Sequence, residues 1–149
     1  YMTVKGLEKY GHEALAEVIA RKNMQTMHKV FQSTGTIWEL YSPDMYMPAT
    51  DATGIHMVKP NFVGWSGLIP ISMFIENIIG IRTDGSANRI NWRSNSPKRH
   101  GIQNLRFGNI TTTLIREGDT LDIQSNAPYI LEINVIEHDI KEGNNQIQL

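Results

Sequence analysis

One carboxylate lies between two aromatic residues in the segment Trp38-Glu39-Leu40-Tyr41. Proteins bind sugar rings with aromatic faces and a few well-placed polar groups. Hydrolysis of a glycosidic bond uses two carboxyl groups, one as an acid and the other as a base or nucleophile. Glu39 is therefore a candidate for one of these roles. The alternative is that Glu39 is an ordinary loop residue, solvated or hydrogen-bonded, which is the commoner fate of a Glu beside aromatic residues.

Other catalytic and metal-binding patterns are missing from the sequence. The chain has no cysteine and five histidines, none of them in HxH or HExxH spacing, so we expect no metal site. The segment Gly64-Trp65-Ser66-Gly67 is only loosely like a nucleophile elbow, because it lacks the GxSxG frame and follows no strand pattern. No glycine-rich phosphate loop precedes a predicted helix. We therefore expect no cofactor.

Three blocks of the chain resemble a known enzyme family. Residues 7–11 read LEKYG, residues 33–43 read STGTIWELYSP, and residues 59–70 read KPNFVGWSGLIP. In this order and spacing they resemble the end of the (α/α)6 toroid in trehalases and processing α-glucosidases, in particular bacterial relatives of mannosyl-oligosaccharide glucosidase. Residues 99–108 are similar to the β extension that follows the toroid. The combination of Trp-Glu-x-Tyr with Gly-Trp-Ser-Gly carries most of this resemblance.

The resemblance implies a catalytic role for Glu39. In that family the Glu of the Trp-Glu-x-Tyr segment is the general base of an inverting reaction, and it activates water for attack on the anomeric carbon. The family's acid is an Asp on an earlier loop, and no segment of this chain matches that loop. Asp44 and Asp51 are near Glu39 in sequence, but neither matches the acid motif. We therefore expect the chain alone to be inactive.

The aromatic residues of the two motifs are the predicted substrate-binding residues. By resemblance, Trp65 would line a sugar subsite, and Tyr41 would orient the base or contact the sugar; Trp38 completes the set. Trp65 has a simpler interpretation as well, because by default it would pack under the start of a helix.

The first 35 residues predict two helices that lead into this loop. Gly11 separates a short helix over residues 3–10 from a longer one over residues 13–33, and Gly35 is a helix stop. The predicted buried face of the longer helix consists of apolar residues at helical spacing: Leu15, Val18, Ile19, Met27, Val30 and Phe31. Residues 34–63 show no period, and a loop of about 30 residues is usually functional. Its methionines at positions 45, 47 and 57 are expected to fill gaps in the packing.

A third helix is predicted after this loop, capped by Ser66, with Pro70 in its first turn and Gly80 at its end. Apolar residues surround most of it, so we expect it to be buried on several sides, with a missing partner. At about 12 residues, its apolar stretch is shorter than the roughly 20 that a membrane span needs.

After residue 84 the apolar period becomes two, which predicts strands. The alternating positions are Ile110, Thr112 and Leu114; Leu121 and Ile123; and Tyr129, Leu131, Ile133 and Val135. Turn residues at 117–119 and 125–128 separate the runs. This part should form an antiparallel sheet of four or five strands.

Composition fits a folded protein without a nucleic-acid or membrane partner. Hydrophobic residues make up 40% and charged residues 19% of 149 residues, and the net charge is −1. Six Lys or Arg and one acid lie between residues 82 and 106, whereas residues 117–142 carry seven acids and one Lys. We expect these two stretches to pair across strands.

The predicted fold is α+β: the last helices of an α/α toroid over residues 1–82, then a small antiparallel β-sheet over residues 83–149. Because the chain opens without an initiator Met or a signal sequence, we expect it to be the C-terminal part of a longer glycoside hydrolase that inverts α-glucosidic or related bonds. The resemblance favours a periplasmic or secreted parent. The expected partners are an oligosaccharide substrate and the N-terminal remainder of the parent protein.

Two alternatives describe the chain itself. It could be a carbohydrate-binding module with Trp38, Tyr41 and Trp65 as its platform, which would bind glycans without Glu39. It could also be a structural domain that binds nothing and has an exposed apolar helical face, which would drive formation of a homodimer.

Overall fold

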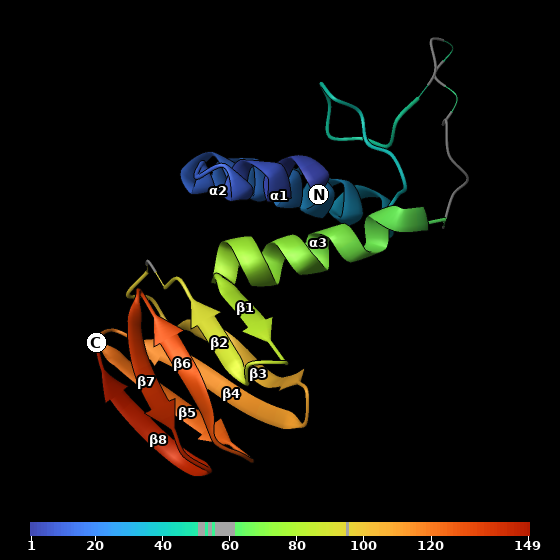
Figure 1. Ribbon diagram of the computed structural model, residues 1–149. Helices are drawn as coiled ribbons and strands as arrows, with labels where there is room; N and C mark the ends of the chain where they lie inside the picture. The colour runs from blue at the N-terminus through green and yellow to red at the C-terminus, as the bar shows by residue number, and fades with distance from the viewer. Residues whose placement is uncertain (51–52, 54, 56–61, 95) are drawn as a thin grey trace. The chain divides into compact units, whose positions relative to one another are not determined.

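The computed structural model describes residues 1–50, 53, 55, 62–94 and 96–149, with only the backbone for residues 65 and 66. The chain divides into two compact units, Tyr1–Ile78 and Ile79–Leu149. Helices make up the regular structure of the first unit and strands that of the second (Figure 1). The domain boundary predicted after residue 82 falls inside the first strand, β1 (Ile81–Asp84).

The first unit begins with the two predicted helices. These are α1 (Met2–Lys9) and α2 (Glu13–Thr34). Gly11 separates them with φ 78°, and Gly35 ends α2 in the left-handed region, where its N–H donates to the Phe31 carbonyl at 2.7 Å. Glycine adopts these positive φ angles without a steric penalty. The predictions of both helices and of their glycine boundaries are confirmed.

The buried side of α2 differs from the predicted face. Its buried residues are Ala16, Ala20, Met27 and Val30. Three of the predicted face residues, Leu15, Val18 and Phe31, are about half exposed. The buried alanines cluster with Val4 of α1, because small side chains let the two helices approach each other closely. The prediction gave weight to large apolar residues and missed a contact face made partly of alanine.

The second helical segment has three kinds of turn. A 3-10 helix, η1 (Gly64–Gly67), leads into α3 (Leu68–Met73), which continues as the π-helix η2 (Phe74–Ile79). Gly80 follows with φ 88°, as its predicted role as a helix stop requires. Ser66, the predicted N-cap, lies within the 3-10 turn instead of before the helix.

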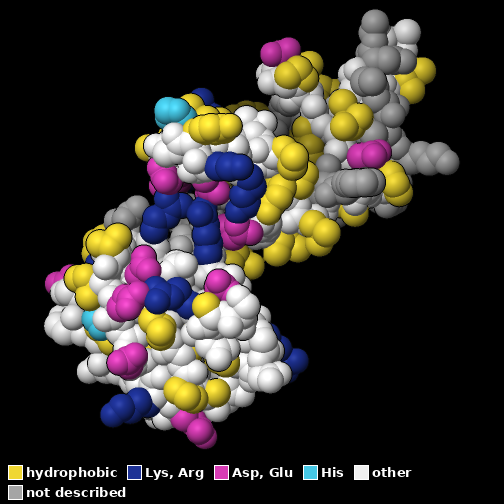
Figure 2. Space-filling view, in the orientation of Figure 1, with side chains coloured by type: hydrophobic (Ala, Val, Ile, Leu, Met, Phe, Trp, Pro, Cys, Tyr) yellow, Lys and Arg dark blue, Asp and Glu magenta, His cyan; other side chains and the backbone are white. Residues whose placement is uncertain are grey.

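Burial of this segment is one-sided, so the prediction of a helix buried on several sides is wrong for this structure. Pro70 and Met73 are buried, whereas Leu68, Ile71 and Phe74 are 77%, 58% and 46% exposed. These three residues recur at a spacing of three and share one side. Hydrophobic surface is visible on the helical unit (Figure 2). None of the described helices is long and apolar enough to cross a membrane.

The second unit consists of two four-stranded sheets. The strands beyond β1 are β2 (Arg89–Trp92), β3 (His100–Phe107), β4 (Ile110–Glu117), β5 (Thr120–Ser125), β6 (Tyr129–Ile133), β7 (Ile136–Ile140) and β8 (Gly143–Gln148). One sheet has the order β1-β2-β6-β7 and the other β3-β4-β5-β8. The β2–β6 pair is parallel and the other strand pairs are antiparallel.

The predicted fold class was wrong in its particulars. The described residues form an α+β fold, in which the first unit has three α-helices and the second has two four-stranded sheets of mixed strand order in a β-sandwich-like arrangement. They are not the last helices of an α/α toroid with a small antiparallel sheet. An alternating apolar pattern shows that a strand has one buried face. It cannot show which strands share a sheet, and it gave no sign of the parallel pairing between β2 and β6.

The core of the second unit uses the predicted alternation. All the predicted inward positions from Ile110 to Ile133 are buried, whereas Val135 is 88% exposed because it lies in the β6–β7 turn. The two sheets meet at Tyr129 of β6. Its ring contacts Phe107 of β3 edge-on at 5.5 Å between ring centroids, and its hydroxyl lies 3.1 Å from the hydroxyl of Thr112 on β4.

The predicted pairing between the basic and acidic stretches is confirmed. Arg89 on β2 contacts Glu132 at 3.0 Å and Glu137 at 2.5 Å. Arg99 contacts Glu117 at 3.4 Å. The Arg99–Glu117 pair is largely exposed, so it should contribute little to stability. The side chains of Arg89 and Glu132 are partly buried.

Candidate functional site

The loop after α2 is fixed to the end of that helix through Trp38. The Trp38 ring is 6% exposed and forms a small core with Val30. Its indole N–H donates to the Thr34 hydroxyl at 2.9 Å, and its backbone N–H donates to the Tyr41 hydroxyl oxygen at 3.0 Å. Trp38 therefore anchors the loop, and little of its ring is exposed.

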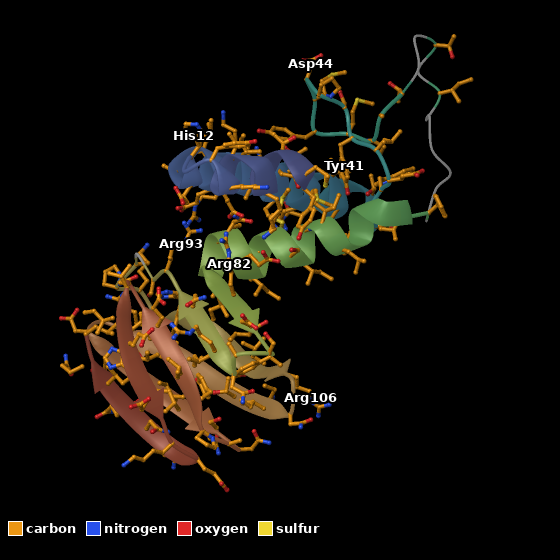
Figure 3. The ribbon with its side chains drawn as sticks, in the orientation of Figure 1. His12, Tyr41, Asp44, Arg82, Arg93 and Arg106 are labelled. Atoms are coloured by element: carbon orange, nitrogen blue, oxygen red, sulfur yellow. The ribbon has the colours of Figure 1, made fainter. Side chains whose placement is uncertain are left out.

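Tyr41 closes the base of the same loop. It pairs with Pro48 in an isolated antiparallel bridge, supported by the hydrogen bond from the Ala49 N–H to the Leu40 carbonyl at 3.1 Å. Burial raises the pKa of the Tyr41 phenol, and the hydrogen bond from the Trp38 backbone opposes this shift. A raised pKa keeps the phenol neutral and able to donate a proton in a hydrogen bond. Figure 3 labels Tyr41 beside the helices and Asp44 at the far turn of the loop.

Glu39 follows Trp38 and is half-buried. Its side chain lies against Gly64, the first residue of η1: a Cβ atom placed on Gly64 would be 2.9 Å from the Glu39 Cγ and 3.0 Å from its Oε1. Gly64 also has φ 50°, in the left-handed region. The structure thus brings the Trp-Glu-x-Tyr and Gly-Trp-Ser-Gly segments together. The Glu39 side chain packs against the backbone of Gly64, in the space that a Cβ atom would otherwise occupy.

The remaining predicted residues of the site are only partly described. Trp65 follows Gly64 in η1, so its backbone is near Glu39, but its side chain lies outside the described structure. Asp51 and Met57 also lie outside the described residues. Asp44 is exposed, and Met45 is 59% exposed instead of filling a gap in the packing as predicted. The roles predicted for Glu39, Trp38, Tyr41 and Trp65 remain predictions.

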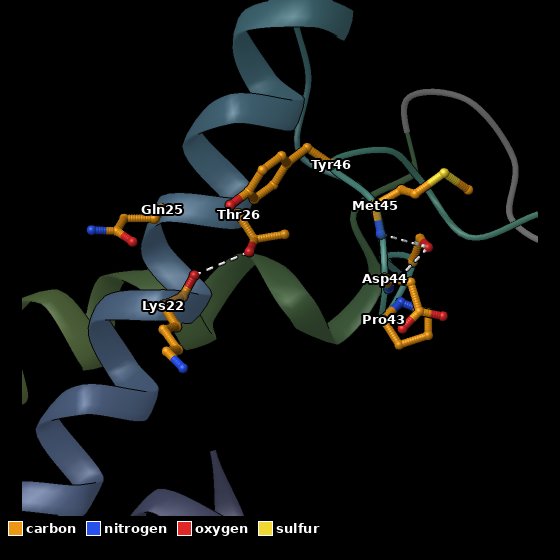
Figure 4. A pocket seen from close by; sticks show the side chains of 8 residues that line it. Lys22, Gln25, Thr26, Pro43, Asp44, Met45 and Tyr46 are labelled. Atoms are coloured by element: carbon orange, nitrogen blue, oxygen red, sulfur yellow. Dashed lines mark hydrogen bonds between the residues drawn. The ribbon is translucent and has the colours of Figure 1, made fainter.

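A shallow pocket of about 330 Å³ lies between α2 and this loop (Figure 4). Its lining residues are Lys22, Gln25, Thr26, Ser42, Pro43, Asp44, Met45 and Tyr46. The Ser42 hydroxyl accepts the backbone N–H of Met45 at 3.2 Å, and Lys29 lies 3.8 Å from the centroid of the Tyr46 ring. The described lining contains none of the predicted site residues, so this pocket is separate from Glu39.

Sequence analysis missed a cluster of buried charge in the first unit. The Glu8 carboxylate, with its side chain 6% exposed, accepts a hydrogen bond from the Asn77 amide and pairs with Lys5 at 3.6 Å. Lys5 also contacts Glu76, which accepts the Ser72 hydroxyl at 2.6 Å. Buried charges require such partners, so the cluster joins α1 to η2. No local pattern reveals it, because residues 8 and 77 are distant in sequence.

A second missed cluster surrounds Ser94, which is 2% exposed. The Asn134 side chain accepts the Ser94 N–H at 3.0 Å and donates to its carbonyl at 3.1 Å. The Ser94 hydroxyl lies 2.9 Å from the His100 Nε2 and accepts from Arg116 at 3.0 Å. A Ser–His contact can mark a nucleophile, but this hydroxyl is buried and is held by His100 of β3 and Arg116 of β4. Because Asn134 of the β6–β7 turn binds the Ser94 backbone, the cluster joins the two sheets.

Neither cluster resembles a metal centre. Among the described residues there is no group of three or more His, Cys, Asp or Glu that could hold an ion. The two carboxylates nearest to such a role, Glu8 and Glu76, are bridged by the ammonium of Lys5.

Comparison with known proteins finds distant similarities. No family model matches the chain. A protein of Borreliella burgdorferi described as "Uncharacterized protein" is 26% identical over 145 residues, covering 91% of this chain and 31% of that protein. The chain therefore spans about a third of the length of this relative. The solved structure of "Putative kojibiose phosphorylase from human microbiome" has a TM-score of 0.40 and 12% identity, covering 54% of this chain and 11% of that chain. This distant similarity assigns no residue and no reaction to the present chain.

Proposed function

We propose that this chain is part of a glycoside hydrolase that cleaves α-glucosidic or related glycan bonds with inversion, and that Glu39 is its general base. The packing of the Glu39 side chain on Gly64 carries the proposal. It places the only carboxylate of the Trp-Glu-x-Tyr segment beside the Gly-Trp-Ser-Gly segment. These are the two motifs on which the resemblance to sugar hydrolases depends, and nothing in their sequence separation requires them to meet.

The proposed reaction needs one group that this chain does not supply. Glu39 accepts a proton from a water molecule, and the water oxygen forms a bond to the anomeric carbon while the glycosidic carbon–oxygen bond breaks on the opposite face. A carboxylic acid elsewhere in the whole protein gives its proton to the leaving oxygen. The remainder of that polypeptide is thus a proposed partner of this chain, together with the oligosaccharide.

The aromatic residues take different parts in this proposal. Tyr41, held neutral by burial, is suited to orient the Glu39 carboxylate or a sugar hydroxyl. Trp65 would line the sugar subsite. Trp38 supports the site by fixing the loop, because its ring is buried against Val30. The burial of Trp38 also weakens the alternative of a carbohydrate-binding platform, which would need all three rings to face a sugar.

The test is the activity of the full-length polypeptide that contains this chain. We expect the wild-type protein to release glucose or a related sugar from α-linked oligosaccharides, with the first-formed anomer inverted, as followed by proton NMR. Glu39→Gln should lower kcat by a factor of about 100 to 10,000, because a general base contributes about that much. Substrate binding, measured as KM, should change little, because Gln keeps the shape of the side chain.

Glu17→Gln is the matched control. Glu17 is a half-buried acid of α2 that pairs with Arg21 at 2.7 Å, away from the site. Its substitution should leave kcat unchanged. Wild-type rates in Glu39→Gln on every glycan that the protein hydrolyses would refute the assignment of Glu39. Retention of anomeric configuration would refute the inverting mechanism.

A further inference from the structure

Edge strands expose backbone hydrogen-bonding groups that another strand can pair with, and proteins usually protect them. The second unit, called the β unit from here on, has four edge strands among those described. They are β1 and β7 in one sheet, and β3 and β8 in the other. Three of them carry a protective feature. β1 has only four residues, β7 carries Glu137 and Asp139, and β3 has an irregularity between Ile102 and Leu105 that breaks its register.

β8 has none of these features. It has six residues, pairs regularly with β5 along its whole length, and contains no charged residue and no proline. Its sequence, GNNQIQ, carries uncharged amide side chains. It is the last strand drawn in Figure 1, in the darkest red.

The register shows which backbone groups face away from β5. The Leu149 N–H donates to the Asp119 carbonyl at 2.8 Å, and these residues continue the β5–β8 ladder. Hydrogen-bonded pairs alternate along an antiparallel ladder, so Ile147, Asn145 and Gly143 turn their backbone groups toward β5. The N–H and C=O groups of Asn144, Gln146 and Gln148 therefore point out from the edge of the sheet.

We propose that this edge of β8 binds the same edge of a second copy of the chain, in antiparallel pairing, to form a dimer with a continuous eight-stranded sheet. This proposal is independent of the proposed function. A two-fold axis at Gln146 pairs Asn144 with Gln148 of the second copy and Gln146 with its own counterpart. It is the register in which all three outward residues find a partner.

Charge also favours a second copy as the occupant. A two-fold axis brings identical residues together, so a charged edge would place like charges close to each other and repel its own copy. β8 has no charge to repel, whereas copies of β7 would bring the carboxylates of Glu137 and Asp139 together. The amide side chains of Asn144 and Gln148 can instead hydrogen-bond across the pair, whereas the Gln146 amide donates to Asp122 of its own copy at 2.8 Å.

Sedimentation velocity of the whole chain from about 1 to about 200 µM tests the proposal, because an interface of this small area should be weak and concentration-dependent. We expect the wild-type protein to shift from monomer to dimer over this range. Gln146→Pro removes an outward N–H without removing a backbone hydrogen bond to β5, although it loses the side-chain hydrogen bond to Asp122 of β5. It should remain monomeric with an unchanged circular dichroism spectrum.

A second pair of variants separates charge from folding. Gln146→Lys places like charges across the two-fold axis, each beside Asp122 of its own copy, and should weaken the dimer. Gln124→Lys adds the same charge on the neighbouring strand β5, away from the edge, and should dimerise like the wild type. Ile71→Lys on the exposed side of α3 should also dimerise normally. A monomeric wild type, a dimer that persists in both Gln146 variants, or a dimer lost only in Ile71→Lys would overturn the proposal.

Discussion

At the scale of single residues, Gly64 meets two requirements at once. Its φ of 50° is one that L-residues rarely adopt, and its missing Cβ leaves the space that the Glu39 side chain occupies. Gly11 has a similar φ of 78° but no atom within 4 Å of its would-be Cβ. The two glycines therefore share the backbone requirement and differ in the carboxylate contact.

We expect Gly64→Ala to destabilise the first unit by about 2 to 3 kcal/mol and to displace Glu39. Gly11→Ala should lower the free energy of unfolding by only about 1 kcal/mol, because this glycine has the positive φ angle but no contact with a carboxylate. Thermal unfolding of the two variants measures the difference. In the full-length protein, Gly64→Ala should also lower kcat, because a carboxylate moved by about 1 Å no longer aligns the water. Equal unfolding temperatures for both variants would show that Glu39 tolerates the added methyl group.

Glu39 itself shows how far sequence reasoning reaches at this scale. Its position between two aromatic residues and its motif were visible in the chain. The burial of Trp38 was not, because the Thr34 hydroxyl that holds the indole N–H looks like an ordinary helix-end residue. The Gly64 contact was also hidden, because it joins residues on either side of a long aperiodic loop.

At the scale of elements, the β6–β7 hairpin contains a strained turn. Its two turn residues, Asn134 and Val135, have φ 48° and 69°. Asn tolerates this region, and here its side chain also binds both backbone groups of Ser94. Val135 is β-branched, so its positive φ is a true outlier. Its side chain is 88% exposed and gains little from packing.

Val135→Gly should stabilise the β unit by about 1 kcal/mol, because Asn-Gly is the preferred pair for a two-residue hairpin turn and loses the steric strain of Val. We expect a rise of a few degrees in the unfolding temperature followed by circular dichroism. Asn134→Gly is the informative comparison. This substitution relieves backbone strain at the other positive φ angle of the same turn, but it removes two hydrogen bonds to Ser94. It should therefore lower stability. An unchanged or lower unfolding temperature for Val135→Gly would contradict the strain argument.

Element boundaries were the part of the fold that sequence predicted well. Gly11, Gly35 and Gly80 mark breaks that the structure contains, and period-two alternation located the buried residues of β4, β5 and β6. The assignment of strands to sheets could not be predicted, because every inward-facing apolar residue looks alike whichever sheet it belongs to. The buried alanines of α2 were missed for a similar reason, since alanine occurs on both faces of helices.

At the scale of the whole molecule, the β unit depends on Tyr129, where the two sheets meet. Burial raises the pKa of the Tyr129 phenol to about 12, against an ordinary value of 10.0, and the hydrogen bond with Thr112 opposes part of this shift. The folded state therefore favours the neutral phenol more strongly than the unfolded state does. This contribution to stability is complete below pH 10 and is lost as the pH rises from about 10 to about 12.

Over that range we expect the β unit to lose on the order of 2 kcal/mol of its free energy of unfolding. Tyr129→Phe should lose less over the same range, because the buried group no longer ionises, although the other tyrosines still do. Urea unfolding at a series of alkaline pH values measures both proteins. Parallel stability curves for the wild type and Tyr129→Phe would show that another group governs the alkaline loss.

The parallel pairing of β2 with β6 constrains the order in which the chain can fold. The meander β3-β4-β5 closes through short turns, so it can form as soon as those residues are available. β2 precedes this meander in the chain and β6 follows it, so the sheet of β1 and β2 must wait for a distant strand. During synthesis, Ile90 and Trp92 leave the ribosome well before the strand that will cover one edge of β2. Chaperone contact and misfolding should therefore concentrate on β1 and β2.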